Sequence, residues 1–129
     1  MTRSIIDTER APAAIGTYSQ AVRAGDSIYI SGQIPLDPAS GEIVDGGIAE
    51  HVQQVFENLQ ALAQEAGASL DDVVKLTVYL TSMTNFPVVN EVMARYFSRP
   101  YPARAAVGVA ELPKGVAVEM DAIIYRPSR

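Results

Sequence analysis

Two charged side chains lie in otherwise apolar, β-prone segments near the end of this sequence, and both are capable of chemistry. Arg104 lies among small apolar residues, and Glu119 lies in the run from Val116 to Ile124. A guanidinium binds a carboxylate through two parallel hydrogen bonds, a geometry that lysine does not offer. A carboxyl group whose pKa is tuned by burial serves as a general acid or base. Isolated charges in apolar strands are costly, so these two residues either pair for structure or hold a ligand.

Four other residues, at three places in the sequence, suit a small-molecule site. Tyr18 follows a Gly-Thr pair, where its ring either caps a pocket or packs as an ordinary tyrosine. Ser31 and Gly32 offer a hydroxyl group and close approach to the backbone, or they simply end a strand. Asn90 is polar among apolar neighbours and suits a pocket, a helix contact or the surface. The residue types alone leave each pair of interpretations open.

The segment around Arg104 and Glu119 predicts a strand, a turn and a second strand. Its turn is Leu112-Pro113-Lys114-Gly115, since proline presets a turn dihedral and glycine tolerates positive φ. Alternation in the second strand sets Val116, Val118, Met120, Ala122 and Ile124 on one face, with Glu119 and Asp121 on the other.

A simple hairpin sets Arg104 opposite Ala122, so that Arg104 and Glu119 face opposite sides of the sheet. Three outcomes remain open. Arg104 pairs with Glu119 or Asp121 for structure, a β-bulge near Gly108 shifts the register, or the site is shared between subunits.

The remaining elements must position these side chains. Apolar residues recur at helical spacing in two segments, and alternating or β-prone runs mark the strands. We expect helices at 47–66 and 85–97, and further strands at 4–6, 18–23, 27–31 and 73–81. The order is ββ-α-β-α-ββ, and two helices cover only one face of such a sheet. The other face carries Tyr79, Ala117, Ile123 and Tyr125, which predicts that oligomerisation buries it.

The composition excludes several classes of protein. The 129 residues suit one domain, 1–129, with a substantial core. A net charge of −5 without a basic cluster argues against nucleic acid as a partner. There is no cysteine and only one histidine, His51, which we expect on the solvated surface, so a zinc site is not expected. No apolar run approaches the roughly 20 residues of a membrane helix, and no signal-peptide core is present, so a cytoplasmic protein is expected.

Several of these stretches together resemble the RidA/YjgF family of reactive-intermediate (enamine/imine) deaminases. The similar segments are Tyr18-Ser19-Gln20-Ala21, Ser31-Gly32-Gln33-Ile34-Pro35, Asn90, Pro102-Ala103-Arg104 through Leu112-Pro113, and Val118-Glu119-Met120. The resemblance covers nearly the whole chain.

The resemblance implies an α+β, chorismate-mutase-like single domain. In this fold a mixed sheet carries two helices on one face, and three copies form a homotrimer around a central β-barrel with clefts between subunits. It also implies hydrolysis of 2-iminobutanoate and 2-iminopropanoate, released by pyridoxal-phosphate enzymes, to 2-oxo acids and ammonia, without metal or organic cofactor.

The resemblance also implies roles for individual residues. By this resemblance, Arg104 binds the substrate carboxylate and Glu119 activates water. Tyr18, Ser31, Gly32 and Asn90 then shape the pocket.

Two positions depart from the family pattern. Ala106 stands where many members have cysteine two residues after the arginine, so a thiol has no role here and the pocket is roomier and less polar at that point. Thr17 replaces a common proline before the tyrosine. A non-catalytic module that binds small carboxylates or acts as a holdase is the competing interpretation. A ribonuclease, as claimed for some relatives, is disfavoured by the acidic charge balance.

Overall fold

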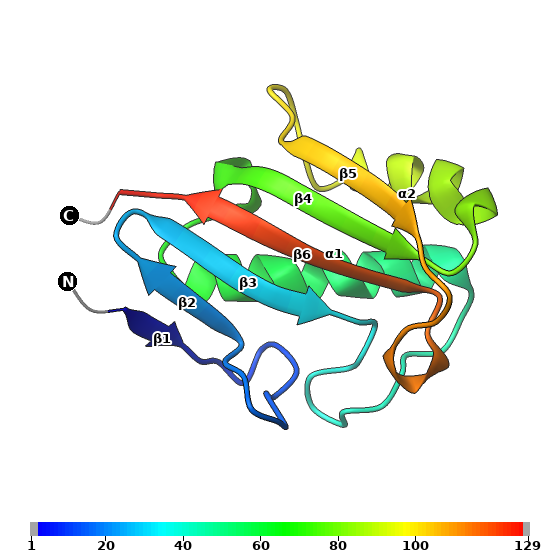
Figure 1. Ribbon diagram of the computed structural model, residues 1–129, viewed down its shortest axis with the longest axis horizontal. Helices are drawn as coiled ribbons and strands as arrows, with labels where there is room; N and C mark the ends of the chain where they lie inside the picture. Colours follow the sequence, from blue (N-terminus) through cyan, green and yellow to red (C-terminus); the bar gives the residue numbers. More distant parts are fainter. Residues whose placement is uncertain (1–2, 128–129) are drawn as a thin grey trace.

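A single mixed sheet organises the chain (Figure 1). The computed structural model describes residues 3–127. Strands follow the spatial order β1-β2-β3-β6-β4-β5, in which only β4 and β5 run parallel. Their bounds are β1 (Ser4–Ile6), β2 (Ala21–Ala24), β3 (Ser27–Gln33), β4 (Val73–Leu80), β5 (Ala103–Gly108) and β6 (Val118–Tyr125). The α+β class, with its mixed sheet, is confirmed.

Two helices, α1 (Ile48–Glu65) and α2 (Phe86–Met93), pack on one face of the sheet (Figure 1). The Glu50 carboxylate accepts a hydrogen bond from the Gly47 N–H at 2.9 Å and so caps the start of α1. At its other end, Gly67 adopts φ 81°, which allows the chain to leave the helix. The apolar stripe expected on α1 is buried against the sheet at Val52, Val55, Phe56, Leu59, Leu62 and Ala63.

The central strand β6 supplies the other half of the core. Val118, Met120, Ala122 and Ile124 are buried beneath the helices, as alternation predicts, while Glu119, Asp121 and Ile123 point to the opposite, open face and remain half-buried. The core therefore lies between β3, β6 and β4 on one side and the two helices on the other.

The predicted hairpin between the last two strands is wrong. β4 lies between β5 and β6, and it pairs in parallel with the former and antiparallel with the latter. The connection crosses the end of β4, where the Val109 N–H donates to the Leu80 carbonyl and the Thr81 N–H donates to the Ala117 carbonyl. The turn at residues 112–115 is correctly predicted. Local turn chemistry does not reveal, however, that β4 lies between β5 and β6.

Some predicted boundaries also need correction. The strand expected from Tyr18 begins at Ala21, because residues 16–18 and Gln20 form bends, and β3 extends beyond the expected end to Gln33. A register shift between Val73 and Lys75 breaks strict alternation, so Val74 is exposed instead of buried. The second helix ends at Met93 instead of Phe97, where tighter turns take over.

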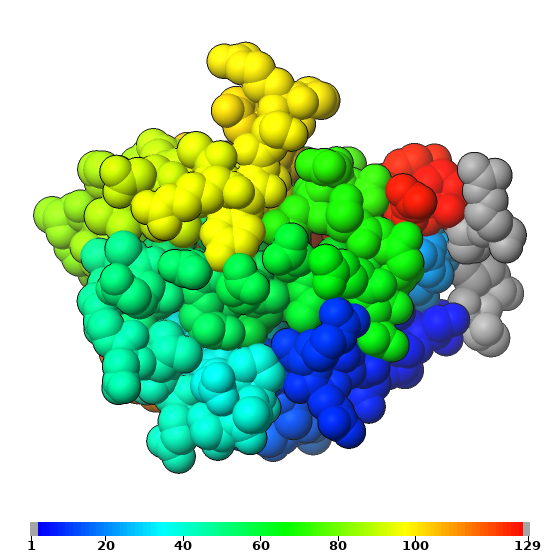
Figure 2. Space-filling model, turned by 180° about the vertical axis from the view of Figure 1, so that it is seen from behind, coloured from blue at the N-terminus to red at the C-terminus, as the bar shows by residue number. Residues whose placement is uncertain are grey.

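The segment between α2 and β5 projects from the body of the molecule (Figure 2). Figure 2 views the side that the helices cover, and the projecting atoms are yellow. Within the described range, no helix is long and apolar enough to cross a bilayer.

The open face of the sheet presents apolar side chains without cover from either helix. Tyr29 is 49% exposed, Tyr125 is 53% exposed, and both lie beside Ile123 on this face. Val107 on β5 is also exposed. Such a concentration is typical of a surface that another protein chain buries.

We therefore predict that the open face is buried in an oligomer, and that Ile123→Asp gives a smaller or unfolded species, because an unpaired carboxylate buried in an interface is costly. Ile43→Asp is the control, since Ile43 is an exposed isoleucine outside the sheet. Light scattering coupled to gel filtration measures both. A wild-type monomer at micromolar concentration, or an Ile123→Asp protein with wild-type mass and melting temperature, would contradict burial of the open face.

Candidate functional site

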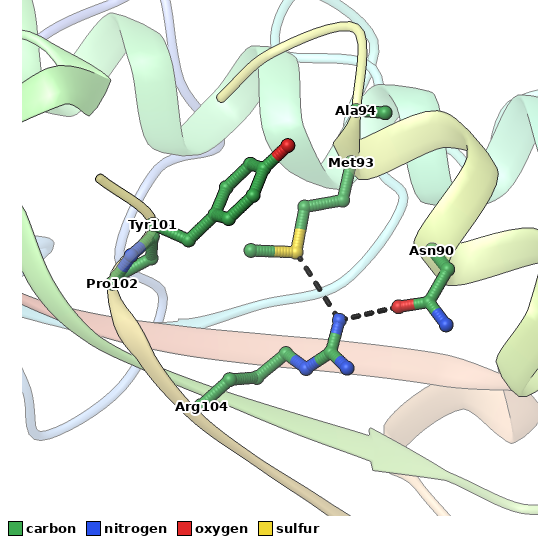
Figure 3. Close-up of a pocket in the computed structure, with 6 residues that line it drawn as sticks. All are labelled: Asn90, Met93, Ala94, Tyr101, Pro102 and Arg104. Carbon is green, nitrogen blue, oxygen red and sulfur yellow. Dashed lines mark hydrogen bonds between the residues drawn. The ribbon is translucent and has the colours of Figure 1, made fainter. Parts of the chain in front are cut away.

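Arg104 is held on the helix side of the sheet by neutral groups (Figure 3). On β5 it lies level with Leu76 of β4 and, one strand further, with Ala122 of β6, both of which are buried under the helices. Its Nη1 donates to Asn90 Oδ1 at 2.6 Å and contacts Met93 Sδ at 3.5 Å. The guanidinium carbon lies 4.8 Å from the centre of the Phe86 ring, a favourable cation–π distance.

These contacts orient the guanidinium without neutralising its charge. Nη1 donates both hydrogen bonds, and within residues 3–127 Arg104 makes no ion pair. A guanidinium has five N–H donors, so the Nη2 and Nε edge is left for a bidentate partner. Beside it lies a cavity of about 430 Å³, lined by Asn90, Met93, Ala94, Tyr101, Pro102 and Arg104 (Figure 3).

Glu119 belongs to a second cavity, of about 480 Å³, at the end of β3. Tyr18, Ser31, Gly32 and Lys114 line it together with Glu119. Burial raises the pKa of the Glu119 carboxyl, and the negative charge of Asp121 raises it further. The carboxyl group accepts no hydrogen bond from any side chain or backbone group in the described part of the chain, so it is available to a ligand.

Gly32 is the residue that allows Glu119 to lie where it does. A methyl group built on Gly32 would overlap Glu119 Oε2 and would lie 2.9 Å from the carboxyl carbon. The expected close backbone approach at this glycine is thus present, and what approaches the backbone is the candidate acid–base group itself.

Hydrogen bonds fix the wall of the Glu119 cavity. The Ser31 hydroxyl donates to the Ser19 carbonyl at 2.6 Å, which ties β3 to the loop that carries Tyr18. The buried Gln20 amide donates to the carbonyls of Thr8, Ala11 and Pro12 and accepts from the Thr8 N–H. The proton of Ser31 is therefore committed to structure, and this hydroxyl serves the cavity by positioning its wall.

Within one chain, the structure excludes two of the three alternatives left open for Arg104 and Glu119. The two residues lie on opposite faces of one sheet and line different cavities. β5 pairs with β4 from Ala103 to Gly108 without a register shift, so the bulge near Gly108 does not form. An ion pair with Glu119 or Asp121 within the chain does not form either.

Several residues around the site were not predicted from the sequence. Phe86 and Met93 share a helix face with Asn90, because spacings of four and three residues bring side chains together on α2. That spacing was a usable signal. Gln20 carried none beyond being a polar residue in an apolar strand.

Two other predicted residues have clear positions. Ala106 lies two residues beyond Arg104 on the same face of β5, half-buried against the core. The His51 ring lies at the surface, where it was expected, but it is partly covered, and its Nε2 lies 2.9 Å from the Val44 carbonyl oxygen.

Comparison with known proteins gives consistent matches along the whole chain. Residues 8–126 match the family described as endoribonuclease L-PSP. The chain is 52% identical to a RutC family protein of Pyrococcus abyssi, covering 98% of this chain and 99% of that protein. It is 50% identical to the 2-iminobutanoate/2-iminopropanoate deaminase of Bos taurus, covering 95% and 90%. The crystal structure of RidA from Psychrobacter superposes with a TM-score of 0.91 at 52% identity, covering 95% and 98%.

The fit between Gly32 and Glu119 leads to a structural prediction. Gly32→Ala should leave the melting temperature nearly unchanged, because the end of a flexible side chain gives way, but it should turn the Glu119 carboxylate out of its cavity. A crystal structure of the variant measures this displacement. Gly41→Ala is the control. A methyl group there meets no atom within 4 Å, but the backbone φ of 73° is strained for alanine, so this variant tests backbone strain without contact to Glu119. An unmoved Glu119 in Gly32→Ala would refute the close fit.

Proposed function

The chain belongs to the endoribonuclease L-PSP (RidA/YjgF) family, and we propose that it is a hydrolytic deaminase of small 2-imino acids and their enamine tautomers. The observation that carries the proposal is the pair of charged groups, each left without a charged partner: a guanidinium with a free edge and a half-buried carboxyl beside Gly32. A substrate with one carboxylate and one C=N bond requires these two groups. Relatives about half identical to this chain are named 2-iminobutanoate/2-iminopropanoate deaminase, which supports the same substrates here.

Arg104 is the substrate-binding residue in this proposal. Its free Nη2 and Nε edge binds the substrate carboxylate in a bidentate contact, while Asn90 holds the other side of the guanidinium. The substrate is so small that this single charge-assisted contact must supply much of its orientation. Ala106, on the same strand face, leaves room next to the bound group.

Glu119 is the proposed acid–base residue. It transfers a proton from water to the imine nitrogen as the water oxygen attacks the imine carbon, which gives a neutral carbinolamine. It then transfers the proton of the carbinolamine hydroxyl to the amino nitrogen, the C–N bond breaks, and ammonia leaves as the carbonyl of the 2-oxo acid forms. Water and imine are consumed in equal amounts, and the carboxyl group ends the cycle in its starting form. Tyr18 closes the cavity over this reaction.

The complete site in this proposal lies between two copies of the chain. Arg104 and Glu119 cannot meet on one sheet, because they occupy opposite faces of it. The uncovered apolar face provides a surface for association, and we propose a homotrimer in which the Arg104 cavity of one copy faces the Glu119 cavity of the next. Each of three identical interfaces then forms one site.

The description of the matched family offers a second candidate, cleavage of RNA. The net charge of −5 and the carboxylates on the open face disfavour it, since binding to phosphates depends on local positive charge. Incubation with single-stranded RNA, with and without Glu119→Gln, tests it directly. Cleavage that co-purifies with the protein and responds to that substitution would favour the nuclease.

We predict that Glu119→Gln keeps the fold and binds 2-oxobutanoate, yet loses turnover by roughly 10²–10⁴-fold, because an amide of the same shape cannot accept a proton. Imine loss is followed by trapping with semicarbazide, with the imine supplied by a threonine dehydratase. Wild-type turnover in Glu119→Gln would show that another group activates the water, and would favour a module that only binds carboxylates.

We predict that Arg104→Lys remains folded with kcat/KM at least tenfold lower, which corresponds to about 1.4 kcal/mol, because lysine keeps the charge but loses the bidentate edge. Arg104→Ala should lose binding of 2-oxobutanoate. The control is Arg10→Ala, since Arg10 makes an exposed ion pair with Glu65 outside the site. Melting temperature and imine turnover are measured on the same preparations. An Arg104→Ala protein that is fully active per folded molecule would overturn the assignment.

A further inference from the structure

A tyrosine and a carboxylate form a hydrogen-bonded pair beside Glu119 on the open face. Tyr79 lies directly across from Glu119 on the neighbouring strand β4, and its hydroxyl donates to Asp121 Oδ2 at 3.0 Å. The bond is diagonal, since Asp121 is level with Thr77, and an aromatic side chain spans that diagonal. The pair therefore fixes a second carboxylate on the same strand face as Glu119.

This hydrogen bond differs from an ordinary surface contact because it holds one carboxylate near another. Glu119 and Asp121 are two residues apart on β6 and both are half-buried. Along a strand this spacing corresponds to about 7 Å, close enough for each charge to affect the other. The hydrogen bond to Asp121, followed by burial, raises the pKa of Tyr79, so its hydroxyl remains a proton donor at neutral pH.

The charged and titratable groups around Glu119 are few in residues 3–127 of its own chain, and in the proposed trimer Arg104 of the neighbouring copy faces the same cavity from the other side. β5 contributes none to this face, because Ala103, Ala105 and Val107 are its open-face residues. The groups from the other elements are Asp121 on β6, Tyr79 and Lys75 on β4, Tyr29 on β3, and Tyr18 and Lys114 on the cavity rim. Of these, Asp121 is the only carboxylate.

We propose that Tyr79 and Asp121 are positioning residues for the deaminase reaction: Tyr79 fixes the Asp121 carboxylate beside Glu119, and this second negative charge controls the proton that Glu119 carries. The inference rests on the proposed function, because it assigns Glu119 the acid–base role. Neither residue touches the substrate in this scheme. Their effect reaches the reaction only through Glu119.

The sign of the effect follows from electrostatics. A negative neighbour disfavours the ionised form of Glu119, so it makes the carboxylate a stronger base once formed and keeps the returned proton available for the leaving nitrogen. Asp121→Asn removes the neighbouring charge and should move the titration of Glu119 to lower pH. Burial is the larger cause of the raised pKa, so the titration should remain above that of an exposed glutamate.

The experiment measures the Glu119 carboxyl directly by carbon-13 NMR titration, with the signal assigned by its loss in Glu119→Gln. In Asp121→Asn the midpoint should fall by roughly 0.5–1 pH unit, from two charges at the strand spacing. In Tyr79→Phe the shift should have the same direction and be smaller, because the Asp121 charge remains but its carboxylate is released. The acidic limb of the kcat/KM profile should move with the NMR midpoint in both variants.

A matched control exists in the same chain. Tyr96 donates to Glu57 Oε2 at 2.6 Å, so Tyr96→Phe also removes a tyrosine–carboxylate bond, but outside both cavities. It should leave the Glu119 midpoint and the pH profile at their wild-type positions.

The results of these experiments distinguish failure of the positioning inference from failure of the proposed deaminase function. Unchanged midpoints in Asp121→Asn and Tyr79→Phe would overturn the inference even with normal turnover, as would a shifted midpoint with an unmoved kcat/KM profile. Absence of imine turnover in the wild type would defeat the proposed function, while the NMR titration would still report whether the pair controls the Glu119 proton.

Discussion

The two-residue repeat of the β-pleat determines where each reactive group of this protein lies. Successive side chains on a strand point to opposite faces, so a residue's position fixes whether it meets the helices or the open surface. Arg104 lies level with Leu76 and Ala122 and therefore faces α2. Glu119 is level with Tyr79 and faces away from the helices. No side-chain rotation brings these groups together across the sheet, so a site that uses both must use two chains.

This constraint was visible in the sequence, although its structural basis was not. Alternation from Val116 to Ile124 correctly predicted the buried face of β6, and the alignment of Arg104 with Ala122 is correct as well. The error was to assume that aligned strands are adjacent. A turn is read from local residues, whereas the insertion of β4 depends on pairing between distant segments, which periodicity does not encode.

The same limit explains which parts of the site the sequence revealed. Arg104, Glu119 and Gly32 stand out because their residue types are unusual in apolar strands. The Tyr79–Asp121 bond does not, since it requires knowing that β4 lies beside β6 and in which register. Residue types thus predicted the proposed reactive groups, while the proposed positioning groups depend on the three-dimensional pairing.

Arg104 and Glu119 lie in different electrostatic environments because they are on opposite faces of the sheet. Arg104 is surrounded by an amide, a thioether and an aromatic ring, which orient it and leave its positive charge uncompensated. Glu119 is placed by burial and by Asp121 in surroundings that disfavour its negative charge.

Had the two groups shared one cavity within a chain, they would have formed an ion pair. That pair would have lowered the pKa of the carboxyl and occupied the guanidinium edge that a substrate needs. Separation on opposite faces prevents this pairing within a chain, and in the proposed trimer a substrate would lie between the two groups. The substrate carboxylate then supplies the negative charge that Arg104 lacks within its own chain.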